Sequence, residues 1–296
     1  MPAYVDRRVV DLDGAARAAA VAADEFGVET PALMRAGMNA IFRCGDVVLR
    51  VATPNAPARV SLELARTLGA AGRAVPLPWS NEVIDTDGFA VTAWPFVSST
   101  STPTDWRAVG TLVARVHQLA PGDLPAGLPT PSPLEFPWWD HETLLADVAA
   151  LLDEPARDGL SAAIDRNAHW RGAVEADTVV CHGDVHPGNV ITSQHGPVLV
   201  DWDLLCLAPA GWDHAPMMTG AQRGGGTRGV YRDMASGAGG PGRGDPAAEA
   251  FAELRLASAT LMRLRVARAA PGAMDEAQRR LAFWRGDPDA PMWSAQ

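Results

Sequence analysis

No lysine occurs among the 296 residues, so all 25 basic side chains are arginines. Any task that needs a fixed positive charge therefore falls to a guanidinium group. Only three cysteines are present, an odd and scattered number that argues against a disulfide framework and predicts a reducing, cytoplasmic location. No apolar run is long enough to span a bilayer, and the first residues carry no apolar core of a signal peptide, so we expect no membrane association.

Acidic residues outnumber basic ones by 35 to 25, which gives a net charge of −10. This balance makes nonspecific binding to nucleic acid unfavourable and mildly favours a cationic small-molecule partner. A hydrophobic content of 47% and a mean hydropathy of −0.03 are typical of globular proteins. The chain is long enough for two lobes with a substantial core.

The first third of the chain predicts a small α+β lobe that ends near residue 97. A helix is expected at 14–26, with Asp13 as its N-cap and Gly27 just past its end. Alternating or apolar runs predict strands at 31–36, 39–44, 46–52, 82–84 and 89–94, with a helix at 58–71 between the third and fourth.

Helical patterns dominate from residue 98 onward. They cover 104–119, 141–152, 156–173, 228–236 and 246–269. Between them, short apolar runs at 178–181, 189–192 and 197–200 predict strands, the last two forming a hairpin around the turn at 194–196.

The segment 178–203 carries the residues best suited to chemistry. Asp184, Asn189 and Asp201 fall on a short loop and hairpin between predicted buried strands. One carboxylate of such a set can accept the proton of an attacking hydroxyl. The other carboxylate and the amide oxygen can hold Mg²⁺ against nucleotide phosphates. This donor set favours metal-assisted phosphoryl transfer.

Other interpretations of the same segment remain open. Asp, Asn, Gly and Pro are ordinary turn residues. Cys181, His182 and His186 with Asp184 could form a transition-metal cluster of a hydrolase, although their spacing matches neither a zinc ribbon nor a His-Glu-x-x-His helix. We expect His182 to order the loop by hydrogen bonding to the backbone instead.

The run His182-Gly-Asp-Val-His-Pro-Gly-Asn189, followed by Leu199-Val-Asp-Trp-Asp203, resembles the aminoglycoside phosphotransferase and choline kinase-like family, small-molecule relatives of protein kinases. The resemblance implies that Asp184 is the catalytic carboxylate and that Asn189 and Asp201 are the metal ligands. The segment 208–215 resembles the next block of the family, in which Asp213 would brace the catalytic loop from a following helix.

The resemblance covers roughly residues 30–270 and implies a bilobal, protein-kinase-like α+β fold. A nucleotide-binding lobe at 1–97 would combine an antiparallel sheet with one main helix and end in a hinge at 94–97. A larger, mainly helical lobe at 98–296 would contain the catalytic hairpin at 178–203 and the acceptor site.

Four residues of the first lobe are implied to bind the nucleotide. Arg50 stands where the family carries a Lys or Arg for the donor phosphates, and Glu63 on the next helix would fix it in a bidentate ion pair. Trp94 and Phe96 lie in the predicted hinge, beside the expected position of the base. Asp203 would either assist a second metal ion or cap the next segment.

We therefore expect a kinase that uses Mg²⁺ and ATP or GTP to phosphorylate a hydroxyl of a small molecule, such as an amino sugar, aminoglycoside or amino alcohol. The cluster at 138–142, rich in tryptophan and acidic residues, would either contact an amine-bearing acceptor or anchor a loop on the helical lobe. The alternative is a catalytically silent nucleotide- or ligand-binding protein on the same fold.

Overall fold

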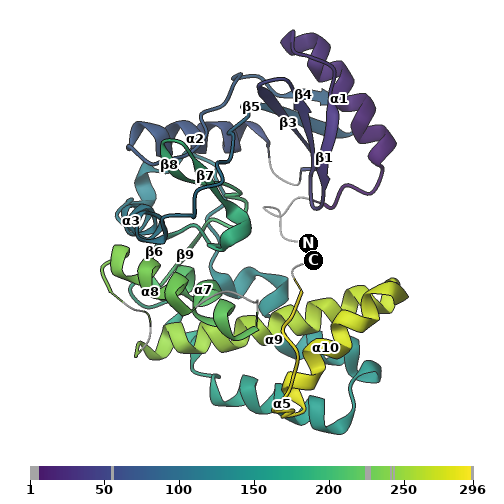
Figure 1. Ribbon diagram of the computed structural model, residues 1–296, viewed down its shortest axis with the longest axis vertical. Helices are drawn as coiled ribbons and strands as arrows, with labels where there is room; N and C mark the ends of the chain where they lie inside the picture. The colour runs from purple at the N-terminus through teal and green to yellow at the C-terminus, as the bar shows by residue number, and fades with distance from the viewer. Residues whose placement is uncertain (1–6, 55–56, 224–227, 241, 243, 295–296) are drawn as a thin grey trace. The chain divides into compact units, whose positions relative to one another are not determined.

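The computed structural model describes residues 7–54, 57–223, 228–240, 242 and 244–294 (Figure 1). The described part of the chain divides into two compact units. The first comprises Met1–Asp105, Leu119–Thr130 and Pro187–Leu204, and the second comprises Trp106–Gln118, Pro131–His186 and Leu205–Gln296. Within the described ranges, no helix has the length and apolar character needed to cross a bilayer.

An antiparallel five-stranded sheet in the order β1-β2-β3-β5-β4 forms the base of the first unit. Its strands are β1 (Ala32–Ala36), β2 (Ala40–Cys44), β3 (Val47–Ala52), β4 (Ile84–Thr86) and β5 (Phe89–Pro95). Arg50 on β3 lies opposite Ile41 on β2 and Thr92 on β5. The central strands are thus paired on both sides, which fixes the position of Arg50 along the sheet.

Helix α1 (Leu12–Phe26) covers one face of this sheet. Its N-cap is Asp11, whose carboxylate accepts a hydrogen bond from the Gly14 N–H at 2.8 Å, so the prediction of Asp13 is wrong. Asp13 instead lies in the first turn, where a negative charge complements the helix dipole. Gly27 ends the helix with φ of 64°, as predicted.

Alternate residues of β2 and β3 pack beneath α1, and the others face away from it. The inward set is Ala40, Phe42, Cys44, Val47, Leu49 and Val51. Because side chains of a strand alternate between faces, Arg50 projects from the face opposite α1.

The hairpin of β7 (Val190–Ser193) and β8 (Gly196–Leu199), preceded by the short helix η5 (Pro187–Asn189), also belongs to the first unit. The Leu199 N–H donates to the carbonyl of Ala74, which follows helix α2 (Arg59–Ala70), at 3.3 Å. On the other strand, the Thr100 N–H donates to the Thr192 carbonyl at 2.8 Å. Both strands of the hairpin are therefore attached to the unit that carries the sheet.

The second unit is mainly helical. Its helices are α3 (Trp106–Val116), α4 (His141–Val148), α5 (Glu154–Arg166), α6 (Trp170–Ala173), α7 (Gly211–Arg223), α8 (Arg228–Gly237), α9 (Pro246–Ala269) and α10 (Met274–Trp284). The paired strands β6 (Val179–Cys181) and β9 (Cys206–Ala208) complete it, with 3₁₀ turns at Pro133–Glu135, Pro137–Trp139, Ala149–Leu151 and Pro271–Ala273. Helix α9 packs against α4, α5, α7 and α10 and is the central element of this unit (Figure 1).

Two glycines allow α3 and α8 to touch through their backbones. A methyl group on Gly110 of α3 would overlap the carbonyl oxygen of Met234 on α8. Conversely, a methyl group on Gly237 of α8 would overlap the carbonyl oxygen of Arg107 on α3. Glycine is required at both positions because the helices approach more closely than any side chain permits.

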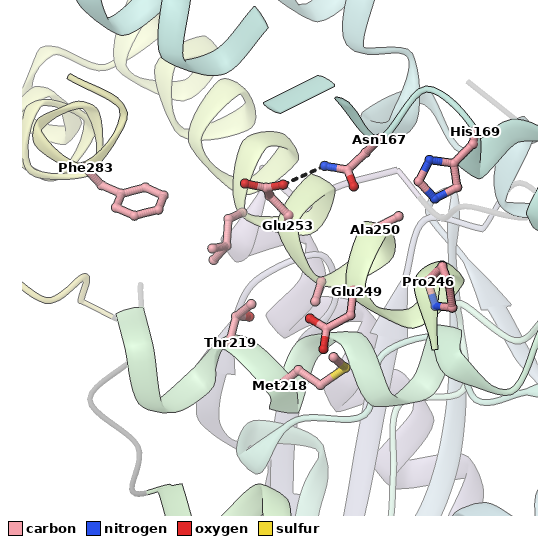
Figure 2. Close-up of a pocket in the computed structure, with 11 residues that line it drawn as sticks. Asn167, His169, Met218, Thr219, Pro246, Glu249, Ala250, Glu253 and Phe283 are labelled. Carbon is pink, nitrogen blue, oxygen red and sulfur yellow. Dashed lines mark hydrogen bonds between the residues drawn. The ribbon is translucent and has the colours of Figure 1, made fainter. Parts of the chain in front are cut away.

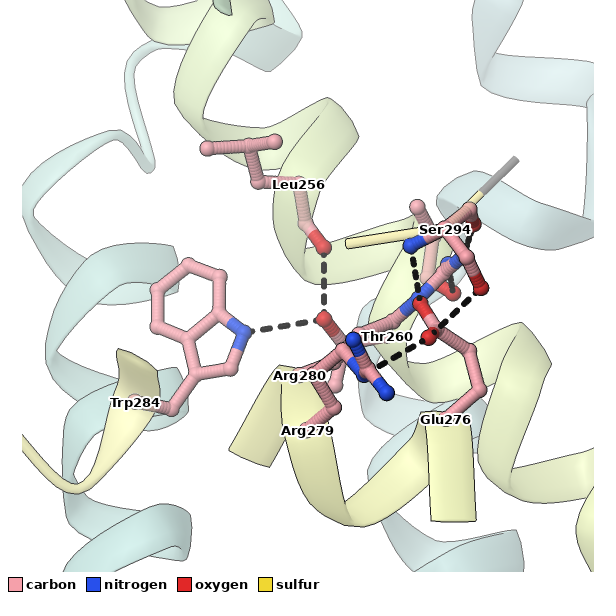
Figure 3. Close-up of polar contacts among 8 residues, drawn as sticks. Leu256, Thr260, Glu276, Arg279, Arg280, Trp284 and Ser294 are labelled. Carbon is pink, nitrogen blue, oxygen red and sulfur yellow. Dashed lines mark hydrogen bonds and ion pairs between the residues drawn. The ribbon is translucent and has the colours of Figure 1, made fainter. Parts of the chain in front are cut away.

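A buried polar network joins α9, α10 and the segment that follows α10 (Figure 3). Glu276 accepts hydrogen bonds from Arg280 Nε at 2.9 Å and from the Ser294 hydroxyl at 2.8 Å. The indole N–H of Trp284 donates to the Thr260 hydroxyl at 2.9 Å, which in turn donates to the Leu256 carbonyl at 2.9 Å. These contacts hold α10 against α9.

Candidate active site

Arg50 lies in a charged cluster of the first unit. Its Nη2 forms an ion pair with Asp203 Oδ2 at 2.5 Å, and the side chains are 16% and 31% exposed, respectively. Asn39, with its amide oxygen turned to the guanidinium, accepts from Nε at 3.1 Å and from Nη2 at 2.7 Å. The cluster joins the turn between β1 and β2, strand β3 and the segment after β8.

The ion pair between Arg50 and Glu63 is absent from the described part of the chain. Asp203, not Glu63, is the carboxylate that pairs with Arg50, and the Asn39 amide oxygen accepts hydrogen bonds from the same guanidinium. Glu63 lies on α2, half-buried between the buried residues Leu62 and Leu64. A role for Glu63 in nucleotide binding stays a prediction, but not through a pair with Arg50.

Asn189 and Asp201 flank the open end of the β7–β8 hairpin. The last ladder pair is Val190 with Leu199, and beyond it the Val200 N–H donates to the Asn189 carbonyl at 3.1 Å. Asn189 is buried, whereas Asp201 is exposed and adopts φ of 65°, a left-handed conformation that costs a non-glycine residue free energy. The hairpin therefore places the two proposed metal ligands on neighbouring backbone positions.

Trp94 and Phe96 are both half-buried where β5 ends. The Trp94 indole N–H donates to the Thr92 hydroxyl at 2.9 Å, and the Arg43 guanidinium lies 3.8 Å from the centroid of the Phe96 ring. The Phe96 N–H donates to the Asp46 carbonyl at 2.7 Å. That N–H is therefore already used within the sheet, and contacts of this segment with a base stay a prediction.

Asp184 belongs to the second unit, in the loop after β6. Its Oδ1 forms an ion pair with Arg255 Nη2 of α9, and its Oδ2 lies 3.3 Å from His186 Nε2. Burial raises the pKa of Asp184, but the charge of Arg255, together with the hydrogen bond and charge of His186, outweighs it and holds the pKa well below its usual range. The carboxylate is therefore ionised at neutral pH.

Asp213, at the start of α7, holds the loop that carries Asp184 in place, the bracing that the resemblance implied. Its carboxylate accepts the backbone N–H groups of His182 at 2.9 Å and Gly183 at 2.8 Å, and lies 3.0 Å from His117 Nε2. Burial raises the pKa of Asp213. The hydrogen bond and charge of His117 lower it by more than burial raises it, so the net shift is downward. Inside the loop, the Asp184 N–H donates to His182 Nδ1 at 3.3 Å, the backbone contact expected of His182.

Among the described residues, possible metal-ligand atoms come together at His117, Cys181 and Asp213, not at the alternative cluster of Cys181, His182 and His186 with Asp184. Asp213 already accepts three hydrogen bonds, as described above. Burial raises the pKa of the Cys181 thiol well above its ordinary value, which disfavours the thiolate that binds metal. The geometry therefore favours a structural contact over a transition-metal site.

The cluster at 138–142 serves mainly to anchor a loop. Trp139 is buried and packs against the rings of Trp170 and Trp212, with centroid distances of 5.1 and 4.4 Å. Asp140 caps α4 by accepting the Thr143 N–H at 3.1 Å. His141 is buried, and burial lowers its pKa to about 4.

The second unit also contains a cavity of about 430 Å³ beside α9 (Figure 2). The carboxylates of Glu249 and Glu253 lie on its α9 side, and Asn167 Nδ2 donates to Glu253 at 2.6 Å. Arg166 also pairs with Glu253, so much of the negative charge at this end of the cavity is already compensated.

Comparison with known proteins identifies the family. Residues 41–251 match the profile of the phosphotransferase enzyme family. The chain belongs to this family. A search of curated proteins returned no match.

Solved structures of kinase-like fold resemble this phosphotransferase family member. Spectinomycin phosphotransferase in complex with ADP and spectinomycin matches with 15% identity and a TM-score of 0.66, covering 86% of this chain and 89% of that one. The GDP complex of aminoglycoside 2'-phosphotransferase-IIIa matches with 15% identity and a TM-score of 0.69, covering 90% and 96%. A choline/ethanolamine kinase family protein from Mesorhizobium loti matches with 18% identity and a TM-score of 0.60, covering 88% of each chain.

The ion pairs of Arg255 with Asp184 and of Asp203 with Arg50 are site contacts that sequence patterns do not reveal. Arg255 lies 71 positions from Asp184, and its helix was recognised only by an apolar stripe that gives no information on polar partners. Asp203 was recognised as a candidate, but its ion pair spans 153 positions. Neither contact produces a local pattern.

Proposed function

We propose that the protein is a Mg²⁺-dependent cytoplasmic kinase that transfers the γ-phosphate of ATP or GTP to a hydroxyl of an amino sugar, aminoglycoside or amino alcohol. Membership of the phosphotransferase family and the nucleotides bound by similar structures support this class of reaction. The observation that carries the proposal is the loop of Asp184, whose backbone is fixed by two hydrogen bonds to the buried carboxylate of Asp213.

In this proposal Asp184 is the general base. As the acceptor oxygen forms its bond to the γ-phosphorus, the hydroxyl proton passes to the Asp184 carboxylate and the nucleoside diphosphate leaves. Phosphoryl transfer proceeds through a loose transition state with little demand for a strong nucleophile. Position and ionisation of the carboxylate therefore matter more than high basicity, in agreement with its depressed pKa.

The oxygen donors of Asn189 and Asp201 fit Mg²⁺, a hard cation that prefers carboxylate and carbonyl ligands. When bound, Mg²⁺ would neutralise charge on the donor phosphates. The Val200 N–H donates to the Asn189 carbonyl, which keeps Asn189 next to Asp201 in space. This hydrogen bond supports the proposal that the two side chains bind the same metal ion.

Arg50 is proposed to supply positive charge to the donor phosphates, in a nucleotide-binding lobe at 1–97 that ends at the hinge 94–97. Trp94 and Phe96 would lie beside the base, and the lobe at 98–296 would bind the acceptor. A guanidinium presents its N–H donors in a planar fork whose geometry matches phosphate oxygens.

The test is a phosphorylation screen of amino sugars, aminoglycosides and small amino alcohols with ATP and with GTP, run beside thermal shifts for each nucleotide with and without Mg²⁺. We expect transfer to at least one acceptor and no transfer by Asp184→Asn. Nucleotide-dependent stabilisation without any transfer or hydrolysis would instead identify a silent binding protein. Activity that needs a transition metal but no nucleotide would identify a hydrolase.

A further inference from the structure

Arg255 is directed at the proposed catalytic base from helix α9. It lies near the middle of α9, between the buried residues Leu254 and Leu256. Its Nη2 contacts Asp184 Oδ1, and the two side chains are 29% and 21% exposed. Among the described residues, Asp184 is the polar partner found for Arg255.

We propose that Arg255 is a positioning residue of the phosphotransfer reaction, which holds Asp184 through Oδ1 and leaves Oδ2 to take the proton of the acceptor hydroxyl. The proposal rests on the kinase activity proposed above and adds a residue to its machinery. The proton passes from the acceptor oxygen to Oδ2, the new O–P bond forms, and the bond from phosphorus to the leaving nucleoside diphosphate breaks.

The two carboxylate oxygens differ in their surroundings. Oδ1 is in contact with the guanidinium of Arg255, whereas Oδ2 lies 3.3 Å from His186 Nε2, on a side chain that is 38% exposed. An acceptor hydroxyl can replace or join such a loose contact more easily than it can displace a charge-assisted ion pair. The asymmetry therefore assigns Oδ2 to the substrate.

Arg255 also controls the protonation of the base. The charged or titratable groups that influence Asp184 are Arg255 of α9 and two histidines of its own loop, His186 and His182. With Arg255 removed, the burial that raises the pKa of Asp184 loses the largest influence that opposes it. The acid limb of the rate profile should then move to higher pH, a change that loss of packing alone would not cause.

The experiment compares wild type with Arg255→Ala, Arg255→Lys and the control Arg265→Ala. Arg265 lies on the same helix and pairs at 3.3 Å with Asp147, a partner outside the proposed machinery. Hydrolysis of MgATP, with water as acceptor, is measured from pH 4 to 9, so that no identified acceptor is needed. For Arg255→Ala we expect kcat to fall about 10- to 100-fold, the loss of one charged hydrogen bond, with the KM for MgATP unchanged and the acid limb shifted upward.

Arg255→Lys should recover part of kcat and of the pH profile, because it restores the charge but not the planar fork. Arg265→Ala should behave as wild type. A wild-type rate and pH profile in Arg255→Ala would overturn the proposal while leaving the kinase assignment intact. Absence of hydrolysis and transfer in the wild type would reject the kinase assignment and the role of Arg255 with it.

A readout independent of activity tests the ion pair itself. Urea unfolding of Arg255→Ala, Asp184→Asn and the double variant forms a double-mutant cycle. We expect the double variant to be less destabilised than the sum of the single variants. Additive effects would show that the pair does not form in solution and would overturn the proposal even if both single variants lose activity.

Discussion

Asp184→Asn removes the negative charge of the base while keeping the size and shape of the side chain. We expect turnover to fall about 100- to 10,000-fold, the range for loss of a positioned general base, with ADP affinity unchanged because Asp184 is assigned to the acceptor. Steady-state kinetics and calorimetric titration with ADP measure the two effects. Asp165→Asn, an exposed position on α5, is the control. Near-normal turnover in Asp184→Asn would assign the base to another residue.

Arg50→Ala should lose most activity, mainly through a higher donor KM or a lower turnover, and Arg50→Lys should recover only part of it. The site is built around a forked guanidinium that contacts Asp203 and Asn39 at once, and the shorter ammonium cannot make both contacts.

Asp203→Asn should cause a milder loss of the same kind, and its double variant with Arg50→Ala should be less than additive. Glu63→Ala provides the contrast, because Glu63 does not pair with Arg50 in the described part of the chain. Kinetics for ATP and GTP measure the series. A loss of activity in Glu63→Ala as large as that in Asp203→Asn would support the prediction that Glu63, and not Asp203, fixes Arg50.

Sequence motifs were sufficient to propose Asp184, Asn189 and Asp201 because these residues lie close together in the chain, on one loop and hairpin. The bracing by Asp213 was available only through resemblance to a family. Neither a local motif nor the family resemblance indicates Arg255, because its partner is distant in the chain and a single arginine on a helix is usually solvated.

The attachment of α10 depends on Glu276, which is only 5% exposed. Glu276→Ala leaves the Arg280 guanidinium without its carboxylate, and losing one partner of a buried ion pair typically costs about 3–5 kcal/mol. Arg279→Ala is the matched control, because Arg279 contacts the same carboxylate at 3.3 Å from a side chain that is 45% exposed. We expect a change within about 0.5 kcal/mol for the control. Urea unfolding followed by tryptophan fluorescence measures both.

The contribution of Glu276 should depend on pH with a defined sign. Burial raises its pKa, but the hydrogen bonds from Arg280 and Ser294 outweigh burial, so the folded-state pKa lies below the ordinary value of about 4.3. Its stabilising contribution is therefore complete above the unfolded-state pKa and is lost as pH falls through the folded-state pKa. The difference in unfolding free energy between wild type and Glu276→Ala should shrink between pH 5 and pH 3. A constant difference would show that the charge of Glu276 does not matter.

Hydrophobic patterns predicted most of the strands and the long helix α9, but not every boundary. The expected strand at 82–84 is observed at Ile84–Thr86, and the expected helix at 156–173 is divided into α5 and α6. Asn167 sits at the break, where its side chain donates to the Ala163 carbonyl at 2.8 Å. Such local side-chain bonds compete with the helix, and periodicity does not reveal them.

Helix α10 was missed although its buried residues follow a helical spacing. Ala277, Leu281 and Trp284 face the core at intervals of four and three residues. The sequence analysis made no prediction for this segment, and the packing of these residues with those of α9 in one core cluster shows that it is folded. Similarly, the attachment of residues 187–204 to the unit with the sheet depends on hydrogen bonds of Leu199 and Thr100 to distant carbonyls.

Binding of Mg²⁺ and nucleotide should stabilise the whole protein by mass action, since ligands that bind only the native state raise Tm. We expect ATP to raise Tm more with Mg²⁺ than without it, and Asp201→Ala to abolish that difference. The variant removes an anionic ligand at a residue held at φ of 65°, so Asp201→Asn is needed beside it to separate charge from backbone preference. If Mg²⁺ still enhances the ATP shift in both variants, the metal ligands must be sought elsewhere.

The backbone contact between α3 and α8 makes the site sensitive to the mildest of mutations. Gly→Ala needs only a single-nucleotide change and is usually considered conservative. At Gly110 or Gly237 it would force the two helices apart, because the added carbon meets a carbonyl oxygen instead of space. His117 follows α3 directly and contacts the carboxylate that fixes the catalytic loop. We therefore expect a mutational scan for activity to show intolerance at two glycines that carry no functional group.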